Sequence, residues 1–352
     1  MVQKIIYKVL KNYCWLALLF YFKRWQKNKH SPIPSGPVIF VCTHQNAFLD
    51  AVVMACSMRR DPWFITRANV FKKPLVKKIL NILQMIPVYR FRDGFSTLRK
   101  NDETIEMCVN LLTRGKCILI FGEGNHNNRW FLRPLQKGFA RMAIAAEERH
   151  DWKLGVKIVP VGVQYDSHNA FRSRVLVNFG NPILANEFCN RANTTQQNME
   201  ALITKTADEM KQLILNIPSE DYETQVSYFK KYREIKSDLV EQLQSDQSII
   251  NNYPNEKSPI AKKKSTLSKW LNPFFIYQFV NHLIPFAILQ WVLKTKVSDP
   301  QFIGSLKFSM GMILVPLAYI VQTALCYFLS GSTLITGVYF LSLPLSVLLR
   351  RD

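Results

Sequence analysis

Acidic residues are scarce in this chain of 352 residues, which has 25 Asp and Glu against 46 Lys and Arg. None of them precedes Asp50, whereas residues 1–30 contain seven Lys or Arg. A formal charge of +21 calls for an anionic partner, and nucleic acid and an anionic membrane face are the usual ones. Because the basic residues of 1–30 flank an apolar stretch at 13–22, the distribution favours a membrane and argues against nucleic acid.

Paired cysteines are also absent. The seven Cys are scattered without a CxxC spacing, which argues against a disulfide framework or a structural zinc site and favours a reducing, cytosol-facing compartment. The chain has no GxSxG elbow and no obvious metal-ligand spacing. An apolar share of 48% excludes a disordered chain, and a charged share of 20% excludes a fully embedded bundle.

Residues 4–25 are predicted to form a helix whose uncharged run, 12–22, is shorter than the roughly 20 residues of a membrane span. Tyr13, Trp15 and Tyr21 suit a membrane interface. We therefore expect 1–30 to be an interfacial membrane helix. A cleaved signal peptide is the runner-up, although no small-residue cleavage site follows. A helix packed on its own domain is the other alternative.

The middle of the chain alternates short apolar runs with helical patterns. This alternation predicts an α/β layered domain over 31–185, with a central mostly parallel or mixed sheet. Strands are expected at 38–42, 63–67, 86–89, 117–121, 157–163 and 174–179. A helical extension at 186–250, with helical stretches at 195–216 and 219–248, and a basic linker at 251–269 should follow.

Residues 270–352 are expected to form hydrophobic transmembrane helices, because three segments lack charged side chains: 270–293, 308–329 and 332–349. Lys262, Lys263 and Lys264 should be cytoplasmic. This favours a two-span hairpin of the second and third segments, with the first segment at the interface and the α/β domain in the cytoplasm. Three spans remain the alternative.

His44 follows an apolar strand, and Asp50 begins a helix. A carboxylate beside an imidazole suits general base catalysis, because it fixes the tautomer and stabilises the imidazolium. Six residues along one helix would put the two side chains on different faces, so contact requires His44 to lie in the preceding turn. A helix cap and an unrelated surface residue are the alternative interpretation.

Three further clusters follow predicted strands. Glu123 stands between two glycines, which allow close approach of the backbone to a ligand. Arg90 ends an apolar strand, where α/β proteins tend to place ligands, and arginine is the natural partner of phosphate. Pro160 lies within a strand pattern and argues for an edge strand or a bulge.

Together, the blocks at His44, Arg90, Glu123 and Pro160 resemble those of the glycerolipid acyltransferase superfamily over about 31–185. HQNAFLD has five residues between His and Asp where the family usually has four, as in the fungal-type variant of this motif. FGEGNHN stands in place of the usual FPEGTRS.

The resemblance implies that His44 is the catalytic base and Asp50 its orienting partner. It also implies a set of substrate-binding residues: Arg90 for phosphate, Glu123 and Gly124 for positioning the acceptor, Arg129 or Lys137 in place of the missing motif arginine, and Pro160 in the acyl or acceptor channel.

The implied function is membrane-bound transfer of a fatty acyl group from acyl-CoA or acyl-carrier protein to glycerol 3-phosphate or 1-acylglycerol 3-phosphate. The resemblance implies direct attack, with no acyl-enzyme, no metal and no cofactor. The expected partners are membrane lipids, the thioester and the acceptor, with no nucleic acid. A non-phosphorylated lysolipid acceptor is one alternative, and a non-catalytic lipid-binding membrane protein is another.

Overall fold

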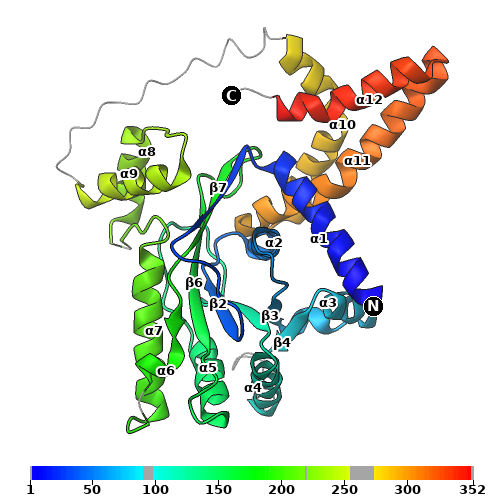
Figure 1. The fold of residues 1–352 in the computed structure, drawn as a ribbon. Helices are drawn as coiled ribbons and strands as arrows, with labels where there is room; N and C mark the ends of the chain where they lie inside the picture. The colour runs from blue at the N-terminus through cyan, green and yellow to red at the C-terminus, as the bar shows by residue number, and fades with distance from the viewer. Residues whose placement is uncertain (1, 90–97, 190, 219, 254–272, 350–352) are drawn as a thin grey trace.

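A computed structural model describes residues 2–89, 98–189, 191–218, 220–253 and 273–349. Its centre is one mixed sheet of eight strands with helices on both faces (Figure 1). The predicted α/β class is therefore confirmed. Arg90 and Lys262 to Lys264, which the sequence singled out, lie outside the described residues.

The strands run in the order β1-β7-β6-β2-β5-β3-β4, with β8 paired to β6. All pairings are parallel except those of β6 with β7 and with β8. The six predicted strands are present. The strand bounds are β1 Arg24–Lys29, β2 Val38–Cys42, β3 Trp63–Arg67, β4 Met85–Val88, β5 Cys117–Phe121, β6 Lys157–Tyr165, β7 Arg174–Phe179 and β8 Ile183–Leu184.

The predicted helix at 4–25 is too long at its C-terminal end. Helix α1 spans Val2–Tyr21, and Arg24–Lys29 forms the edge strand β1, parallel to β7. The expectation of an interfacial helix throughout 1–30 is thus wrong for these residues. An edge strand that pairs on one side can carry a polar sequence such as RWQKNK, which has no apolar alternation to reveal it.

Pro160 lies inside the sheet, so the expectation of an edge strand is wrong. Its strand β6 pairs with β2 on one side and with β7 and β8 on the other. The partner on that other side changes at Pro160: β8 pairs at residues 157–158 and β7 at residues 161–165. Pro160 still accepts a hydrogen bond from the Gly180 N–H at 2.9 Å, and a missing N–H is tolerated between two partners.

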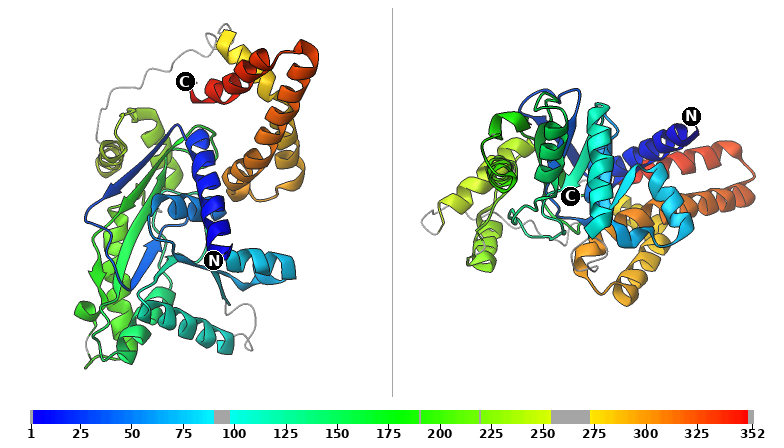
Figure 2. Two further views of the ribbon diagram at one scale, coloured as in Figure 1. Left: turned by 45° about the vertical axis from the view of Figure 1, so that its right-hand side comes forward. Right: turned by 90° about the horizontal axis from the view of Figure 1, so that it is seen from below.

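Helices lie on both faces of the sheet (Figure 2), and each face has its own apolar core. Helices α1 and α2 cover one face together with Phe308 of α11, and α4, α5 and α7 cover the other. The bounds of the helices in this part are α2 Ala47–Ser57, η1 Ala68–Phe71, α3 Pro74–Ile82, α4 Leu98–Thr113, α5 Gly138–Arg149, α6 Ala185–Phe188 and α7 Thr195–Lys211.

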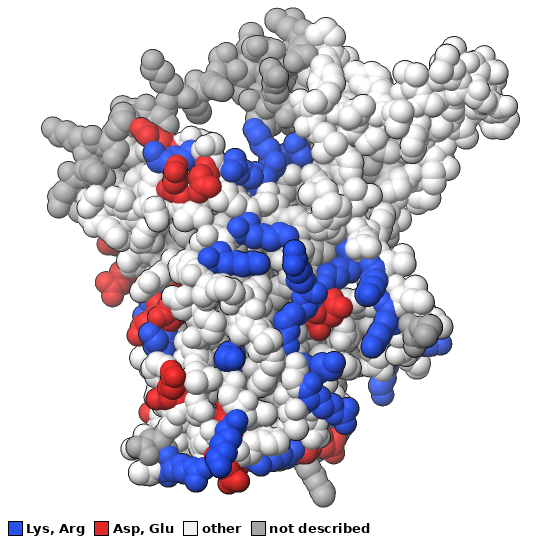
Figure 3. All heavy atoms as spheres, in the orientation of Figure 1, with Lys and Arg blue, Asp and Glu red and all other residues white. Residues whose placement is uncertain are grey.

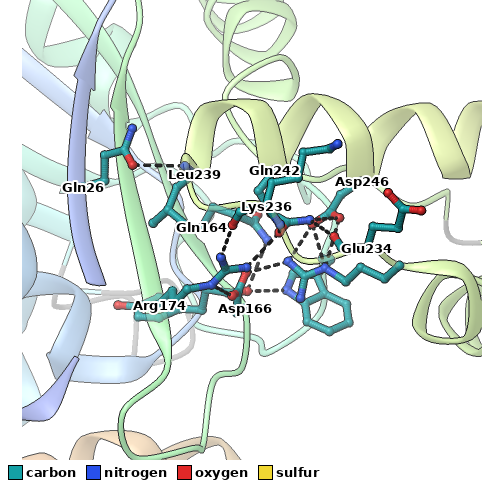
Figure 4. Close-up of polar contacts among 12 residues, drawn as sticks. Gln26, Gln164, Asp166, Arg174, Glu234, Lys236, Leu239, Gln242 and Asp246 are labelled. Carbon is teal, nitrogen blue, oxygen red and sulfur yellow. Dashed lines mark hydrogen bonds and ion pairs between the residues drawn. The ribbon is translucent and has the colours of Figure 1, made fainter. Parts of the chain in front are cut away.

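The stretch expected at 219–248 is two helices, α8 Tyr222–Tyr232 and α9 Leu239–Asn251. A partly buried ionic network joins them to the sheet (Figure 4). Arg233 pairs with Asp166 at 2.6 Å and with Asp246 at 2.7 Å, and Asp166 also pairs with Arg174 of β7. The polar character of this extension therefore serves partly to attach it.

The remaining helices are α10 Pro273–Lys296, η5 Pro300–Phe302, α11 Ile303–Ser330 and α12 Thr333–Leu348. On the face shown in Figure 3 this region is nearly free of charged side chains, whereas they cover much of the α/β part. Within the described ranges, two helices are long and apolar enough to cross a membrane, Pro273–Lys296 and Pro300–Ser330. This pair differs from the expected hairpin of 308–329 with 332–349. The second helix of that hairpin, α12, has only 16 residues, which is short for a membrane span.

Candidate active site

His44 lies in the loop between β2 and α2, and Asp50 lies in the first turn of α2. His44 Nδ1 is 2.8 Å from Asp50 Oδ2. Between them, Ala47 has a φ of +43°, in the left-handed region that residues with a Cβ rarely adopt. The chain turn at Ala47 brings the carboxylate back to the imidazole. This is the contact that the sequence spacing allowed only if His44 preceded the helix.

The Asp50 carboxylate is fully buried and accepts three hydrogen bonds. Oδ2 accepts from His44 and from the Asn46 backbone N–H at 2.8 Å, and Oδ1 accepts from the Tyr165 hydroxyl at 2.7 Å. Burial, and then the charge of Asp50, raises the pKa of Tyr165 well above its ordinary value, so this hydroxyl stays a donor. Because a carboxylate only accepts, His44 Nδ1 carries the shared proton and Nε2 keeps the lone pair.

Glu123 joins its own loop, the FGEGNHN segment at 121–127, to the loop of His44. Its Oε1 accepts a hydrogen bond from the His44 backbone N–H at 2.9 Å, and its Oε2 pairs with Arg133 Nε at 2.7 Å. Burial raises the pKa of Glu123 against the opposing charge of Arg133. The next residue, Gly124, has a φ of +72°, which favours glycine. The structure thus brings His44, Asp50, Glu123 and Gly124 together, as the motif order implied.

Two rings beside His44 were not predicted. Phe121 stacks on the imidazole with ring centroids 4.0 Å apart, because the β2–β5 register pairs Cys42 with Phe121. The ring of His126 lies 5.4 Å from that of His44. Burial lowers the pKa of His126, which favours the neutral form of this ring beside the imidazole. Within the described ranges, no cluster of three His, Cys, Asp or Glu could hold a metal ion.

Two arginines contact the loop of Glu123, at 121–127. Arg133, which the sequence did not select, pairs with Glu123, and Arg67 at the end of β3 donates to Asn125. Arg67 follows the same strand-end signal that singled out Arg90.

Arg129 and Lys137, the residues selected from the sequence, contact the helical extension. Arg129 lies 3.7 Å from Glu223 and over the ring of Tyr222, and Lys137 donates to Gln196 of α7 at 3.1 Å. Their role at the acceptor stays a prediction.

A cavity of about 640 Å³ lies between α1 and the helices α10, α11 and α12. Its lining is mostly apolar and includes Phe20, Phe279, Phe308 and Val315. Gly311 also lines it, and a Cβ there would meet no atom within 4 Å. The cavity therefore has the size and character of a site for a small apolar ligand or a hydrocarbon chain.

Residues 24–164 match the family model described as Acyltransferase. Over 116 residues the chain is 35% identical to glycerol-3-phosphate O-acyltransferase 1 of Saccharomyces cerevisiae, covering 32% of this chain and 15% of that protein. It is 26% identical over 142 residues to a chloroplastic 1-acyl-sn-glycerol-3-phosphate acyltransferase of Brassica napus, covering 40% and 37%.

The chain thus spans 15% and 37% of the lengths of these two relatives. Among solved structures, it aligns with the 1-acyl-sn-glycerophosphate acyltransferase PlsC from Thermotoga maritima with a TM-score of 0.40. The identity is 12%, and the alignment covers 59% of this chain and 81% of that one.

Proposed function

We propose that this chain, whose residues 24–164 match the Acyltransferase family model, moves a fatty acyl group from a thioester to the hydroxyl of a glycerolipid precursor. The observation that carries the proposal is the His44–Asp50 pair, which is tied to Glu123 through the His44 backbone N–H. Glycerol 3-phosphate and 1-acylglycerol 3-phosphate are the proposed acceptors, with acyl-CoA or acyl-carrier protein as donor.

In the proposed reaction, His44 Nε2 takes the proton of the acceptor hydroxyl while the hydroxyl oxygen attacks the thioester carbonyl carbon. Asp50 holds the Nδ1–H and stabilises the imidazolium. A carbon–oxygen bond forms and the carbon–sulfur bond breaks. The departing thiolate then takes the proton from Nε2, which returns His44 to its starting form without an acyl-enzyme.

Arg67 is the proposed phosphate contact among the described residues, because it ends β3 and donates a hydrogen bond to Asn125 in the loop of Glu123. Arg67→Gln should raise KM for a phosphorylated acceptor by about tenfold or more, since a charge-assisted hydrogen bond is lost, and leave kcat little changed. Steady-state kinetics with the acceptor varied measure this. Arg141→Gln, which breaks a surface ion pair with Asp102, is the matched control. An unchanged KM would remove Arg67 from this role.

The apolar cavity beside α11 is the proposed site for the lipid hydrocarbon chain. It is supported by the position of Phe308 in the cavity wall, one turn along α11 from Gly304, which packs against the His44–Asp50 loop. Gly311→Leu should fill part of the cavity and lower kcat/KM for long-chain thioesters several-fold relative to short-chain ones.

The control for the cavity is Gly337→Leu, because Gly337 also faces open space but does not line the cavity. Rates with thioesters of increasing chain length compare the two variants. The same chain-length profile in both would place the hydrocarbon chain elsewhere.

We further propose that the apolar helices α10 and α11 associate with a membrane. Their length and composition support this.

The proposed activity is tested with purified full-length protein, one labelled acyl thioester and separate acceptors. These are glycerol 3-phosphate, 1-acylglycerol 3-phosphate and a non-phosphorylated lysolipid. We expect turnover with a phosphorylated acceptor. Turnover with the lysolipid alone would correct the substrate class, and no turnover with any acceptor would favour a lipid-binding protein.

A further inference from the structure

The beginning of α11 touches the loop that separates His44 from Asp50. The Ser305 hydroxyl donates to the Asn46 carbonyl oxygen at 2.7 Å and accepts from the Leu49 N–H at 3.1 Å. Ser305 is fully buried. A residue more than 250 positions downstream is thus hydrogen-bonded to the backbone on both sides of Ala47, where the loop takes its left-handed turn.

Gly304 allows this close approach. A Cβ at Gly304 would collide with the carbonyl oxygen of His168 and would lie 2.5 Å from Asn46 Oδ1. The same carbonyl accepts a hydrogen bond from Asn46 Nδ2 at 2.7 Å, so the packed helix and the loop share one set of contacts. Only glycine fits between α11 and this loop without movement of the backbone.

The residues around Ser305 extend the contact to the loop of Glu123, at 121–127, and to α1. The ring of Phe302 lies 4.7 Å from that of His126, which itself borders His44. The Tyr21 hydroxyl donates to the Gly304 carbonyl at 3.0 Å. The start of α11 therefore lies between α1 and the two loops of the candidate active site, those of His44 and Glu123.

Ser305 supplies the side-chain acceptor that the N-cap residue of α2 does not. Asn46 is the N-cap of α2, but its side chain makes no capping bond and is directed to His168. A cap side chain ordinarily accepts from the N–H two or three residues later. The Leu49 N–H, three residues after Asn46, donates both to the Asn46 carbonyl oxygen at 3.0 Å and to the Ser305 hydroxyl, so Ser305 adds the side-chain part of a cap to the helix that carries Asp50.

We propose that Ser305 and Gly304 are positioning residues for the His44–Asp50 pair, so that the apolar C-terminal helix α11 holds the catalytic loop in its active geometry. This inference rests on the proposed function. Neither residue takes part in proton transfer; both act through the loop and the first turn of α2.

The test compares Ser305→Ala with Ser309→Ala in the full-length protein. Ser309 lies one turn along the same helix, and its hydroxyl bonds within that helix, to the Leu306 carbonyl. Ser305→Ala should lower kcat roughly five- to tenfold, the size expected for a lost cap, and leave KM for both substrates nearly unchanged. Ser309→Ala should match the wild type. Amide hydrogen exchange of a peptide spanning 44–52 should accelerate only in Ser305→Ala.

A double-mutant cycle separates positioning from a general loss of stability. In a His44→Ala background, Ser305→Ala should cause no further fall in the residual rate, because the loop then has no base to position. Gly304→Ala should lower kcat at least as much as Ser305→Ala. Gly337→Ala, at a glycine in open space, should not.

Unchanged exchange in Ser305→Ala, or faster exchange with an unchanged kcat, would overturn the inference. An equal fall in rate in the His44→Ala background would also overturn it, since the serine would then act independently of the base. A wild-type chain without acyl transfer would instead refute the proposed function, and the positioning role with it. The exchange comparison would still report whether the contact exists.

Discussion

Replacing His44 with alanine is expected to lower kcat for acyl transfer by about 10²- to 10⁴-fold, the contribution of a positioned general base. The imidazole is only 16% exposed and is held in place by Asp50 and by stacking on Phe121, so its loss removes a base with a fixed position. Initial rates of purified wild type and variant, at saturating thioester and acceptor, measure the effect. KM should change far less than kcat.

His150→Ala is the control for the His44 variant. His150 is the C-cap residue that follows α5, and it bonds to Thr113 at the surface, at 2.8 Å, so its loss should leave the rate near that of the wild type. Equal recovery of both variants in the membrane fraction would exclude a folding effect. A His44→Ala enzyme with near-normal kcat would show that His44 is not the base.

Asp50→Asn should be the second most damaging substitution, lowering kcat by roughly 10²-fold. The amide has nearly the same shape as the carboxylate. Its oxygen can still accept from His44 and the Asn46 N–H if the Tyr165 hydroxyl turns to accept from the new NH₂ group. The substitution therefore removes mainly the charge that stabilises the imidazolium as the proton is transferred.

Tyr165→Phe is the matched comparison for Asp50→Asn, because it removes one hydrogen bond to the same carboxylate but keeps the charge. It should lower kcat by no more than about tenfold. Steady-state rates of the two variants, with thermal unfolding as a check on stability, separate charge from hydrogen bonding. A larger loss in Tyr165→Phe than in Asp50→Asn would contradict the assigned role of the carboxylate.

Much of the sheet could be predicted because its strands are short apolar runs buried on both faces, such as Val38–Cys42. The edge strand Arg24–Lys29 could not, because its sequence is polar and its pairing with β7 joins residues 150 positions apart. The expectation of an edge strand at Pro160 failed for a related reason. Pro160, which has no N–H, lies where the strand paired with β6 changes from β8 to β7, and the local sequence does not show this change.

The candidate site divides in the same way. The spacing of His44 and Asp50 defined a contact that a single turn can make, and Glu123 followed a predicted strand. Among the cations after Glu123, however, the structure pairs Arg133 with the carboxylate. The sequence did not predict this pair, because that loop has no periodic pattern to indicate which side chain turns inward. Ser305 could not be found at all, since its contact with the loop depends on the packing of distant helices.

The most direct test of the account is to follow the label during the first turnover. Purified protein is mixed with a labelled acyl thioester, with and without acceptor, and quenched at intervals. Label should pass straight into the acylated acceptor in the wild type, should never appear on the protein, and should barely move in His44→Ala. Label bound to the protein, or product formed at the wild-type rate without His44, would contradict direct attack assisted by this imidazole.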